Sequence, residues 1–167
     1  MPVTLRPYRD TDAEPTWQVF HAAVRVTAAK DYTPEQLEAW SPDEVDLEAW
    51  GRRRAAAWTV VAVEGDRVVG FSDLTDDGVL DMLFVHPDAG GQGVARMLVE
   101  AVLAEARRRG LARVSTHASR TARPAFERLG FVVDRENVDN TTRGVRVPNF
   151  GMSIALNVEF IEPGNRA

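Results

Sequence analysis

Apolar and polar residues follow regular patterns along the first part of the chain. Val3–Pro7 alternates apolar with polar residues, which predicts a β-strand. Beyond this strand, apolar residues three and four positions apart predict a helix with one buried face, and Thr11 or Asp12 can cap its start. The buried face of this helix is expected to carry Trp17, Phe20 and Val24.

Two capping-box patterns follow. Thr33-Pro34-Glu35-Gln36 and Ser41-Pro42-Asp43-Glu44 each place a hydroxyl residue three positions before a side chain that can bond back to it. Both have proline at the first helical position, where its missing N–H is not needed. The patterns predict two short helices within residues 34–53.

Three apolar runs separated by turn residues predict an antiparallel meander. The strands are expected at residues 58–64, 68–74 and 79–85, with turns at Gly65-Asp66 and Asp76-Asp77-Gly78. Since side chains alternate across a strand, one face of the third strand is expected to carry Val79, Asp81, Leu83 and Val85.

The second half of the chain predicts alternating helices and strands. A helix over residues 92–109 has one apolar face and a basic last turn, and it ends at Gly110. The later elements are a strand at 112–118, a helix at 121–129, a strand at 131–138, a loop or irregular hairpin at 139–149 and a strand at 150–156. This order predicts a mixed α/β fold in which a meander precedes a β-α-β unit.

Composition narrows the class of protein. The 167 residues are 44% hydrophobic, which suits one domain over residues 1–167, and the net charge of −5 argues against a nucleic-acid partner. The absence of cysteine excludes disulfides and thiolate chemistry, and the three histidines lack metal-ligand spacing. No signal peptide or membrane span is evident, so a cytoplasmic protein without a membrane partner is expected.

The run Val85–Ala95 joins an apolar strand to a glycine-rich turn that opens into a helix. Glycines let consecutive backbone N–H groups point inward, and the helix start adds unpaired donors and the positive end of its dipole. The run therefore predicts a site for a phosphate-bearing ligand.

Two motifs around this run resemble the GNAT N-acetyltransferase superfamily. The first is Leu83–Pro87 followed by Gly91–Ala95, and the second is Ala125–Phe131. Asp31–Pro34 and Asp81–Val85 are most similar to a bacterial branch of largely uncharacterised members. The resemblance covers nearly the whole chain and implies a GNAT-like acyl-CoA N-acyltransferase fold with a central pair of strands that splay apart.

The resemblance implies acetyl-CoA as cosubstrate and no metal. The pyrophosphate is expected on backbone amides from Gly91 to Arg96, and the pantetheine arm beside the strand near Leu83 and Val85. The cofactor-binding residues expected on this basis are Leu83, Phe84, Val85, Gly90, Gly91, Gln92, Gly93, Val94, Ala95, Arg96, Ser119 and Phe126.

The chain departs from the family pattern at three of these positions. Gly90 stands where glutamine or arginine usually opens the phosphate motif, and Ser119 where asparagine is frequent. Phe126 stands where many members have a tyrosine that protonates the leaving thiolate, and a phenyl ring has no proton to donate. A water, a neighbouring side chain or simple thiolate release has to replace that tyrosine.

Acetyl transfer to an amine needs a group that accepts the amine's proton. Asp81 is the first candidate, directly or through water, and the alternative is a solvated aspartate at the start of a strand. His117 lies at the end of the strand expected to splay from that of Asp81, where it lines the acceptor site, relays a proton or is an ordinary surface histidine. His86 precedes a proline and is interpreted as structural.

The acceptor pocket is expected to be built by the first helices and the last pair of strands, as the resemblance implies. Tyr32, Trp40 and Trp50 are candidates for an aromatic wall, or else simply attach the helices to the sheet. Asn149 and Met152 are candidates from the last strand.

Together these observations favour an acetyl-CoA-dependent N-acetyltransferase. It would act on a primary amine of a small molecule or peptide by direct attack in a ternary complex, since there is no cysteine to hold the acetyl group. A second copy of the chain is a further possible partner. The alternatives are a non-catalytic acyl-CoA-binding module and an α/β domain that uses the glycine turn for ATP.

Overall fold

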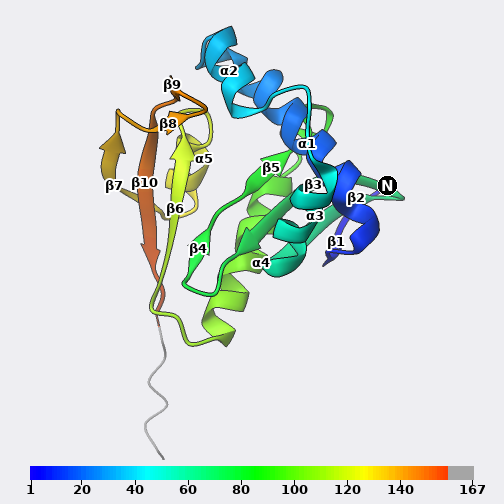
Figure 1. Ribbon diagram of the computed structural model, residues 1–167. Helices are drawn as coiled ribbons and strands as arrows, with labels where there is room; N and C mark the ends of the chain where they lie inside the picture. The colour runs from blue at the N-terminus through cyan, green and yellow to red at the C-terminus, as the bar shows by residue number, and fades with distance from the viewer. Residues whose placement is uncertain (158–167) are drawn as a thin grey trace, which may run out of the picture.

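The computed structural model describes residues 1–157, which fold into two four-stranded sheets and a small hairpin (Figure 1). The first sheet is antiparallel, in the order β1 (Val3–Pro7), β2 (Trp58–Glu64), β3 (Arg67–Leu74) and β5 (Leu83–Val85). The second has the order β4 (Val79–Leu80), β6 (Arg113–Ser119), β10 (Asn149–Ala155) and β7 (Val132–Asn137). The hairpin pairs β8 (Thr141–Thr142) with β9 (Val145–Arg146).

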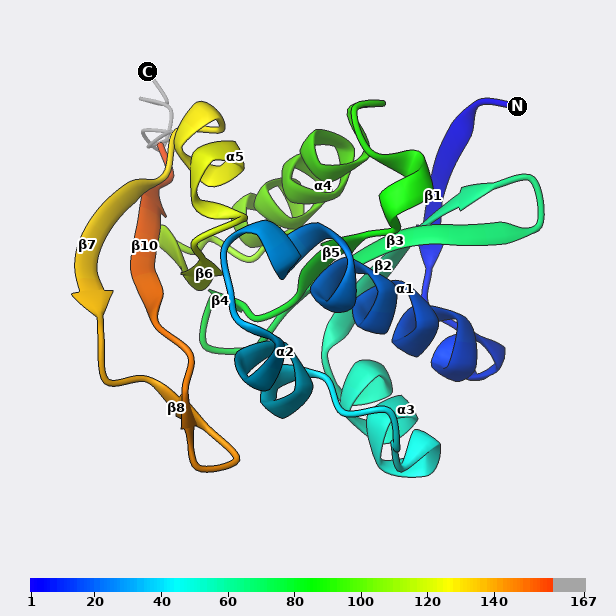
Figure 2. The same ribbon diagram turned by 90° about the horizontal axis from the view of Figure 1, so that it is seen from above.

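Helices cover both sides of the strands (Figure 2). On one side lie α1 (Ala13–Arg25), α2 (Pro34–Trp40) and α3 (Leu47–Ala56), and on the other α4 (Val94–Arg108) and α5 (Arg123–Arg128). Short 3-10 turns are η1 (Asp10–Asp12), η2 (Thr27–Lys30) and η3 (Pro87–Ala89). The mixed α/β class and the splayed central strands are confirmed, and the antiparallel first sheet does not fit a doubly wound nucleotide-binding domain.

Strand alternation divides the apolar residues of the first sheet between the two helix layers. Val61 and Phe71 pack with α1, while Val60 and Val69 pack with Leu98 of α4. All of these side chains are at least nine-tenths buried. Burying an aliphatic or aromatic side chain of this size contributes about 1.5–3 kcal/mol, so both layers are held firmly against the strands.

The expected third strand of the meander is broken at Asp81 and Met82, which corrects the prediction of one continuous strand over 79–85. The Asp73 carboxylate accepts the N–H groups of Asp81 (3.0 Å) and Met82 (2.8 Å). β4 then pairs in parallel with β6, whereas β5 pairs with β3. Asp81 therefore does not share a face with Leu83 and Val85, which pack toward α4.

The two expected helix caps have different outcomes. Thr33 begins α2 with the predicted capping box. The predicted cap at Ser41 is wrong: its hydroxyl lies 2.6 Å from His21 Nδ1, its carbonyl accepts from Arg25, and α3 begins later with Asp46 as its cap. Contacts with α1 therefore override the local sequence pattern.

Asp12 occupies the N-cap position of α1, but its side chain makes no cap bond. Instead it accepts two hydrogen bonds from the Arg6 guanidinium, at 2.7 and 2.9 Å, and one from the Arg9 amide. These bonds fasten β1 to the turn before α1.

The remaining expected elements are present, including the irregular hairpin within residues 139–149. Of the expected domain 1–167, residues 158–167 lie outside the described residues. Within residues 1–157 we find no helix that combines the length and apolar character needed to cross a membrane.

Candidate active site

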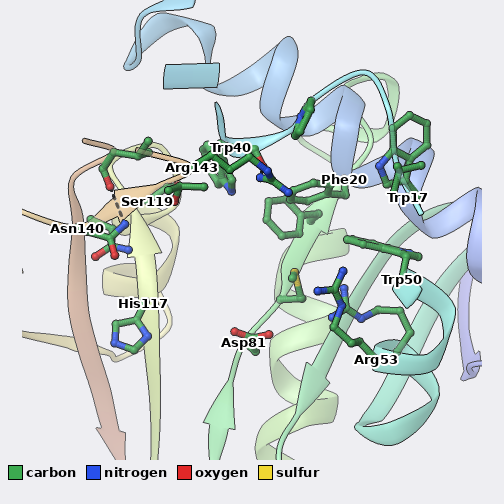
Figure 3. A pocket seen from close by; sticks show the side chains of 18 of the residues that line it. Trp17, Phe20, Trp40, Trp50, Arg53, Asp81, His117, Ser119, Asn140 and Arg143 are labelled. Atoms are coloured by element: carbon green, nitrogen blue, oxygen red, sulfur yellow. Dashed lines mark hydrogen bonds between the residues drawn. The ribbon is translucent and has the colours of Figure 1, made fainter. Parts of the chain in front are cut away.

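A cavity of about 520 Å³ opens where β4 and β5 separate, between α1–α3 on one side and β6, β10 and the hairpin on the other (Figure 3). Aromatic rings and charged groups make up much of its wall. The rings are Trp17, Phe20, Tyr32, Trp40, Trp50 and Phe84. The charged groups are Glu44, Asp46, Arg53, Arg54, Asp81 and Arg143, with His117 beside them.

Asp81 and His117 lie on neighbouring strands where the two sheets divide. Leu80 is in register with Thr116 on the neighbouring strand, so Asp81 and His117 are the next residues along each. Both are exposed, both line the cavity, and Figure 3 shows Asp81 between His117 and Arg53. The two candidate catalytic residues therefore lie together, although the strand alternation used to orient Asp81 does not hold.

The Asp73 carboxylate fixes the backbone at Asp81. Its side chain is 1% exposed and receives the two amides that define the strand break. Burial raises the pKa of Asp73 to about 6, and the nearby Asp81 adds to this, while the hydrogen bond from Met82 and the charge of Arg54 oppose it. Its shifted pKa alone would suggest a functional group, but Asp73 is not part of the cavity wall and acts through the position of Asp81.

Tyr32, Trp40 and Asn149, the expected acceptor-site residues, all line the cavity. The Tyr32 hydroxyl donates to the Pro148 carbonyl (2.7 Å) and accepts from the Arg120 amide (2.9 Å). Burial raises its pKa further above the usual value. Tyr32 is thus both a wall of the cavity and a structural link, so the two interpretations of this residue are compatible.

The aromatic wall is continuous. The Phe84 ring packs edge-to-face against Phe20 with centroids 4.8 Å apart, and Trp40 packs against both Phe84 and Tyr32. Trp50 joins it through Phe20 and donates its indole N–H to Thr16. Such pairs give a rigid apolar surface, since each ring has few rotatable bonds.

The glycine turn lies after β5 in the chain, at the start of α4. Gly91 and Gly93 both have φ +76°, a left-handed conformation, and the helical ladder begins where Met97 donates to the Gly93 carbonyl. The amides before Met97 therefore have no partner inside the helix. The expected set Gly91, Gln92, Gly93, Val94, Ala95 and Arg96 forms one contiguous turn of backbone donors.

Gly90 differs from the glycines that follow it. Its φ of −64° is ordinary and its amide donates to the Pro87 carbonyl at 3.2 Å. His86 caps η3 by accepting the Asp88 amide, which fits its structural interpretation. The donors free to face a ligand thus begin at Gly91.

β5 is the edge strand of the first sheet, which leaves one side of Leu83–Val85 facing the opening between the sheets. The Leu83 and Val85 side chains pack toward α4, while the Phe84 ring points into the cavity. An extended ligand could pair with the backbone here without needing a particular side chain.

Three residues expected near the cofactor or acceptor have structural roles. The Phe126 ring is 2% exposed and packs against Phe131 in the core, and Met152 is 1% exposed in the same cluster. Their contact with a ligand stays a prediction. Ser119 lines the cavity, but its hydroxyl accepts the Ala122 amide before α5.

Sequence reasoning missed Arg53, Arg54 and Arg143. The first two belong to an arginine run in α3 that resembles an ordinary solvated helix face. Arg143 lies in the hairpin with φ 47° and donates to the Ala39 carbonyl of α2 at 2.7 Å. No local pattern identifies these residues, because their partners are far away in sequence.

The fold and this arrangement belong to a known class. A family model described as an acetyltransferase (GNAT) domain matches residues 28–153, which is most of the chain. The chain therefore belongs to the GNAT acetyltransferase family, and it is an acetyltransferase.

Individual relatives agree with this assignment. The chain is 32% identical over 151 residues to the uncharacterized N-acetyltransferase YafP of Escherichia coli (strain K12), covering 90% of this chain and 94% of that protein. It is also similar to a crystal structure described as a GCN5-related N-acetyltransferase (aminotransferase, class II) from Rhodopseudomonas palustris. That likeness has a TM-score of 0.89 and 32% identity over 93% of this chain and 97% of the other.

A more distant neighbour shares the fold alone. YncA of Salmonella typhimurium, solved with its cofactor acetyl-CoA, has a TM-score of 0.72 at 22% identity and covers 94% of this chain and 95% of its own.

Proposed function

We propose that this protein transfers the acetyl group of acetyl-CoA to a primary amine of a small molecule or peptide, by direct attack within a ternary complex. The carrying observation is that Asp81 and His117 follow the last paired positions of the neighbouring strands β4 and β6 and both line a cavity large enough for an acceptor. This pairing favours catalysis over a module that only binds acyl-CoA.

The donor is assigned to the glycine turn and the edge of β5. The free amides from Gly91 to Arg96 suit the pyrophosphate, and the helix dipole adds up to about 2 kcal/mol for an anion. The pantetheine arm extends along the backbone of Leu83–Val85, which brings the thioester toward the cavity. YncA, with its bound acetyl-CoA, supports the choice of donor.

In the reaction the amine nitrogen forms a bond to the thioester carbon and the carbon–sulfur bond breaks. Asp81 accepts the proton that the amine loses, directly or through one water, and His117 lies beside it to relay the proton outward. A backbone amide of β5 polarises the thioester carbonyl.

The leaving thiolate takes its proton from water. The chain has two tyrosines, and the hydroxyl of Tyr32 is engaged with Pro148 and Arg120 while Tyr8 does not line this cavity. Neither can replace the tyrosine hydroxyl that Phe126 lacks. A thiolate is a stable enough anion, with a thiol pKa of about 8.5, to leave without a proton donor, and water protonates it afterwards.

The test is release of CoA from acetyl-CoA across a panel of primary amines, with the acetylated product identified by mass. Turnover with any acceptor supports the proposal. If acetyl-CoA binds but no amine is acetylated, the protein is a binding module; stabilisation by ATP but not by CoA would overturn the assignment of the donor site.

A further inference from the structure

Arg54 is a buried cation with unused donors. It is 3% exposed, its guanidinium lies 4.3 Å above the Trp50 ring, and it lines the cavity. Within residues 1–157, its Nε and Nη1 atoms have no hydrogen-bond partner. An arginine presents five donors in a planar fork that matches a carboxylate, and burying such donors unpaired costs free energy.

The nearby carboxylates do not satisfy these donors. Burial lowers the pKa of Arg54, and the charges of Asp73 and Asp81 offset only part of this effect. Asp73 uses its Oδ1 atom to hold two backbone amides, and neither carboxylate makes a hydrogen bond to Arg54 in the described part of the chain. A guanidinium stays protonated in proteins, so Arg54 is a buried cation with donors that lack a partner among residues 1–157.

Arg53 places a second cation beside the first. It is exposed, lines the same cavity and lies across from His117 with Asp81 between them (Figure 3). The floor of the cavity therefore has cations on α3 next to the proposed base, which suits a ligand with opposite charges close together.

The rest of the wall suits an apolar body. Phe20, Trp40 and Phe84 form the continuous aromatic surface above this charged floor. Aromatic rings that lie between fixed charges favour a ligand that carries both an apolar group and ionised groups.

We propose that the acceptor is an amine that also carries a carboxylate, in its simplest form a free α-amino acid with an apolar side chain. Arg54, with Arg53, binds the carboxylate, the amine lies at Asp81, and the side chain packs on the aromatic wall. This inference rests on the proposed function and names its acceptor. A lysine side chain of a protein, which has no carboxylate beside its amine, does not fit this arrangement.

The experiment compares amino acids with the amines that remain when the carboxylate is removed: phenylalanine with phenethylamine, and leucine with isoamylamine. A charge-assisted hydrogen bond contributes about 1.5–3 kcal/mol, so we expect kcat/KM to be roughly 10- to 100-fold higher for the amino acid. Equal or better turnover of the bare amines overturns the proposal, as does activity limited to lysine peptides.

Two variants locate the effect. Arg54→Met keeps an unbranched buried side chain, and Arg53→Gln changes an exposed one. Both should lower kcat/KM for the amino acids about 10-fold or more, and kcat/KM for the bare amines by a clearly smaller factor. The control is Arg52→Gln, which changes an exposed arginine of the same helix that pairs with Glu48 and does not line this cavity. A loss that is equal for both acceptor types shows a structural role and contradicts the inference.

Failure of the proposed function is distinguishable from failure of the inference. If no acceptor turns over, equilibrium dialysis of phenylalanine and phenethylamine against the CoA-loaded protein still tests whether the cavity has a carboxylate site. Binding of phenylalanine alone that is lost in Arg54→Met supports a carboxylate site; equal binding of both, or of neither, overturns it.

Discussion

The contribution of Asp81 to catalysis is the most direct question at the scale of single residues. Replacing it as Asp81→Asn removes the proton acceptor while keeping size and backbone contacts. We expect kcat/KM to fall by about 10²–10⁴-fold, with acetyl-CoA affinity unchanged in calorimetry. Asp77→Asn, an exposed aspartate in the turn before β4, is the matched control. Wild-type kinetics in Asp81→Asn would remove this residue from the mechanism.

Asp73 gives a prediction about pH and stability. Its pKa of about 6 in the folded protein lies above the ordinary aspartate value of 3.8. The folded state therefore binds more protons than the unfolded state between these values, and stability falls as pH rises through this window. Asp73→Asn keeps an acceptor oxygen but does not ionise. Its stability should therefore not fall with rising pH through this group.

The measurement is urea denaturation of both proteins at pH 4, 5, 6 and 7. Relative to Asp73→Asn, the wild-type protein should lose about 2–3 kcal/mol of unfolding free energy between the ends of this series. A difference that stays constant with pH would show that Asp73 titrates normally.

At the scale of elements, the left-handed glycines of the turn before α4 give a prediction with an internal control. Gly93 has φ +76° and Gly110, at the other end of the same helix, has φ +73°, and both have open space for an added Cβ. Alanine at either position should cost about 1–2 kcal/mol of stability from backbone strain.

Only Gly93→Ala should also weaken acetyl-CoA binding, by about 10-fold or more, because it shifts the amides at the helix start. Isothermal calorimetry of both variants checks this. Equal affinity in Gly93→Ala and Gly110→Ala would place the donor elsewhere.

Local sequence signals predicted elements well where the element uses its own residues. Thr33 caps α2 because its partner Gln36 is three residues away. Ser41 fails to cap because His21 and Arg25 of α1 bind it, and β4 separates from β5 because of a carboxylate on β3. The strand and helix positions were thus largely predictable, and the breaks caused by distant side chains were not.

At the scale of the whole molecule, Tyr32 links the N-terminal helices to the second sheet. Tyr32→Phe leaves the Pro148 carbonyl and the Arg120 amide without this partner, so we expect a loss of about 1–3 kcal/mol in unfolding free energy. Tyr8→Phe, whose hydroxyl has no partner within residues 1–157, should be neutral or slightly stabilising. Urea denaturation decides between them, and equal effects would show that the link does not hold the two parts together.

The candidate site was predictable only in part, because segments far apart in the chain contribute to it. The glycine turn is one contiguous segment and shows in the sequence, and Asp81 could be chosen as an acidic residue in an apolar strand. Arg53 and Arg54 line the same cavity as Asp81, although α3 and β4 are well separated in the sequence. A cavity wall built from segments far apart in the chain leaves no periodic pattern.

The separation of β4 from β5 has a consequence for how such a protein can diversify. The proposed donor contacts come from residues 83–96, whereas the cavity wall comes mostly from residues 17–54 and 140–149. Substitutions in the wall can therefore accumulate without altering the donor contacts. A library restricted to α2, α3 and the hairpin is a route to new acceptors that keeps one acyl donor.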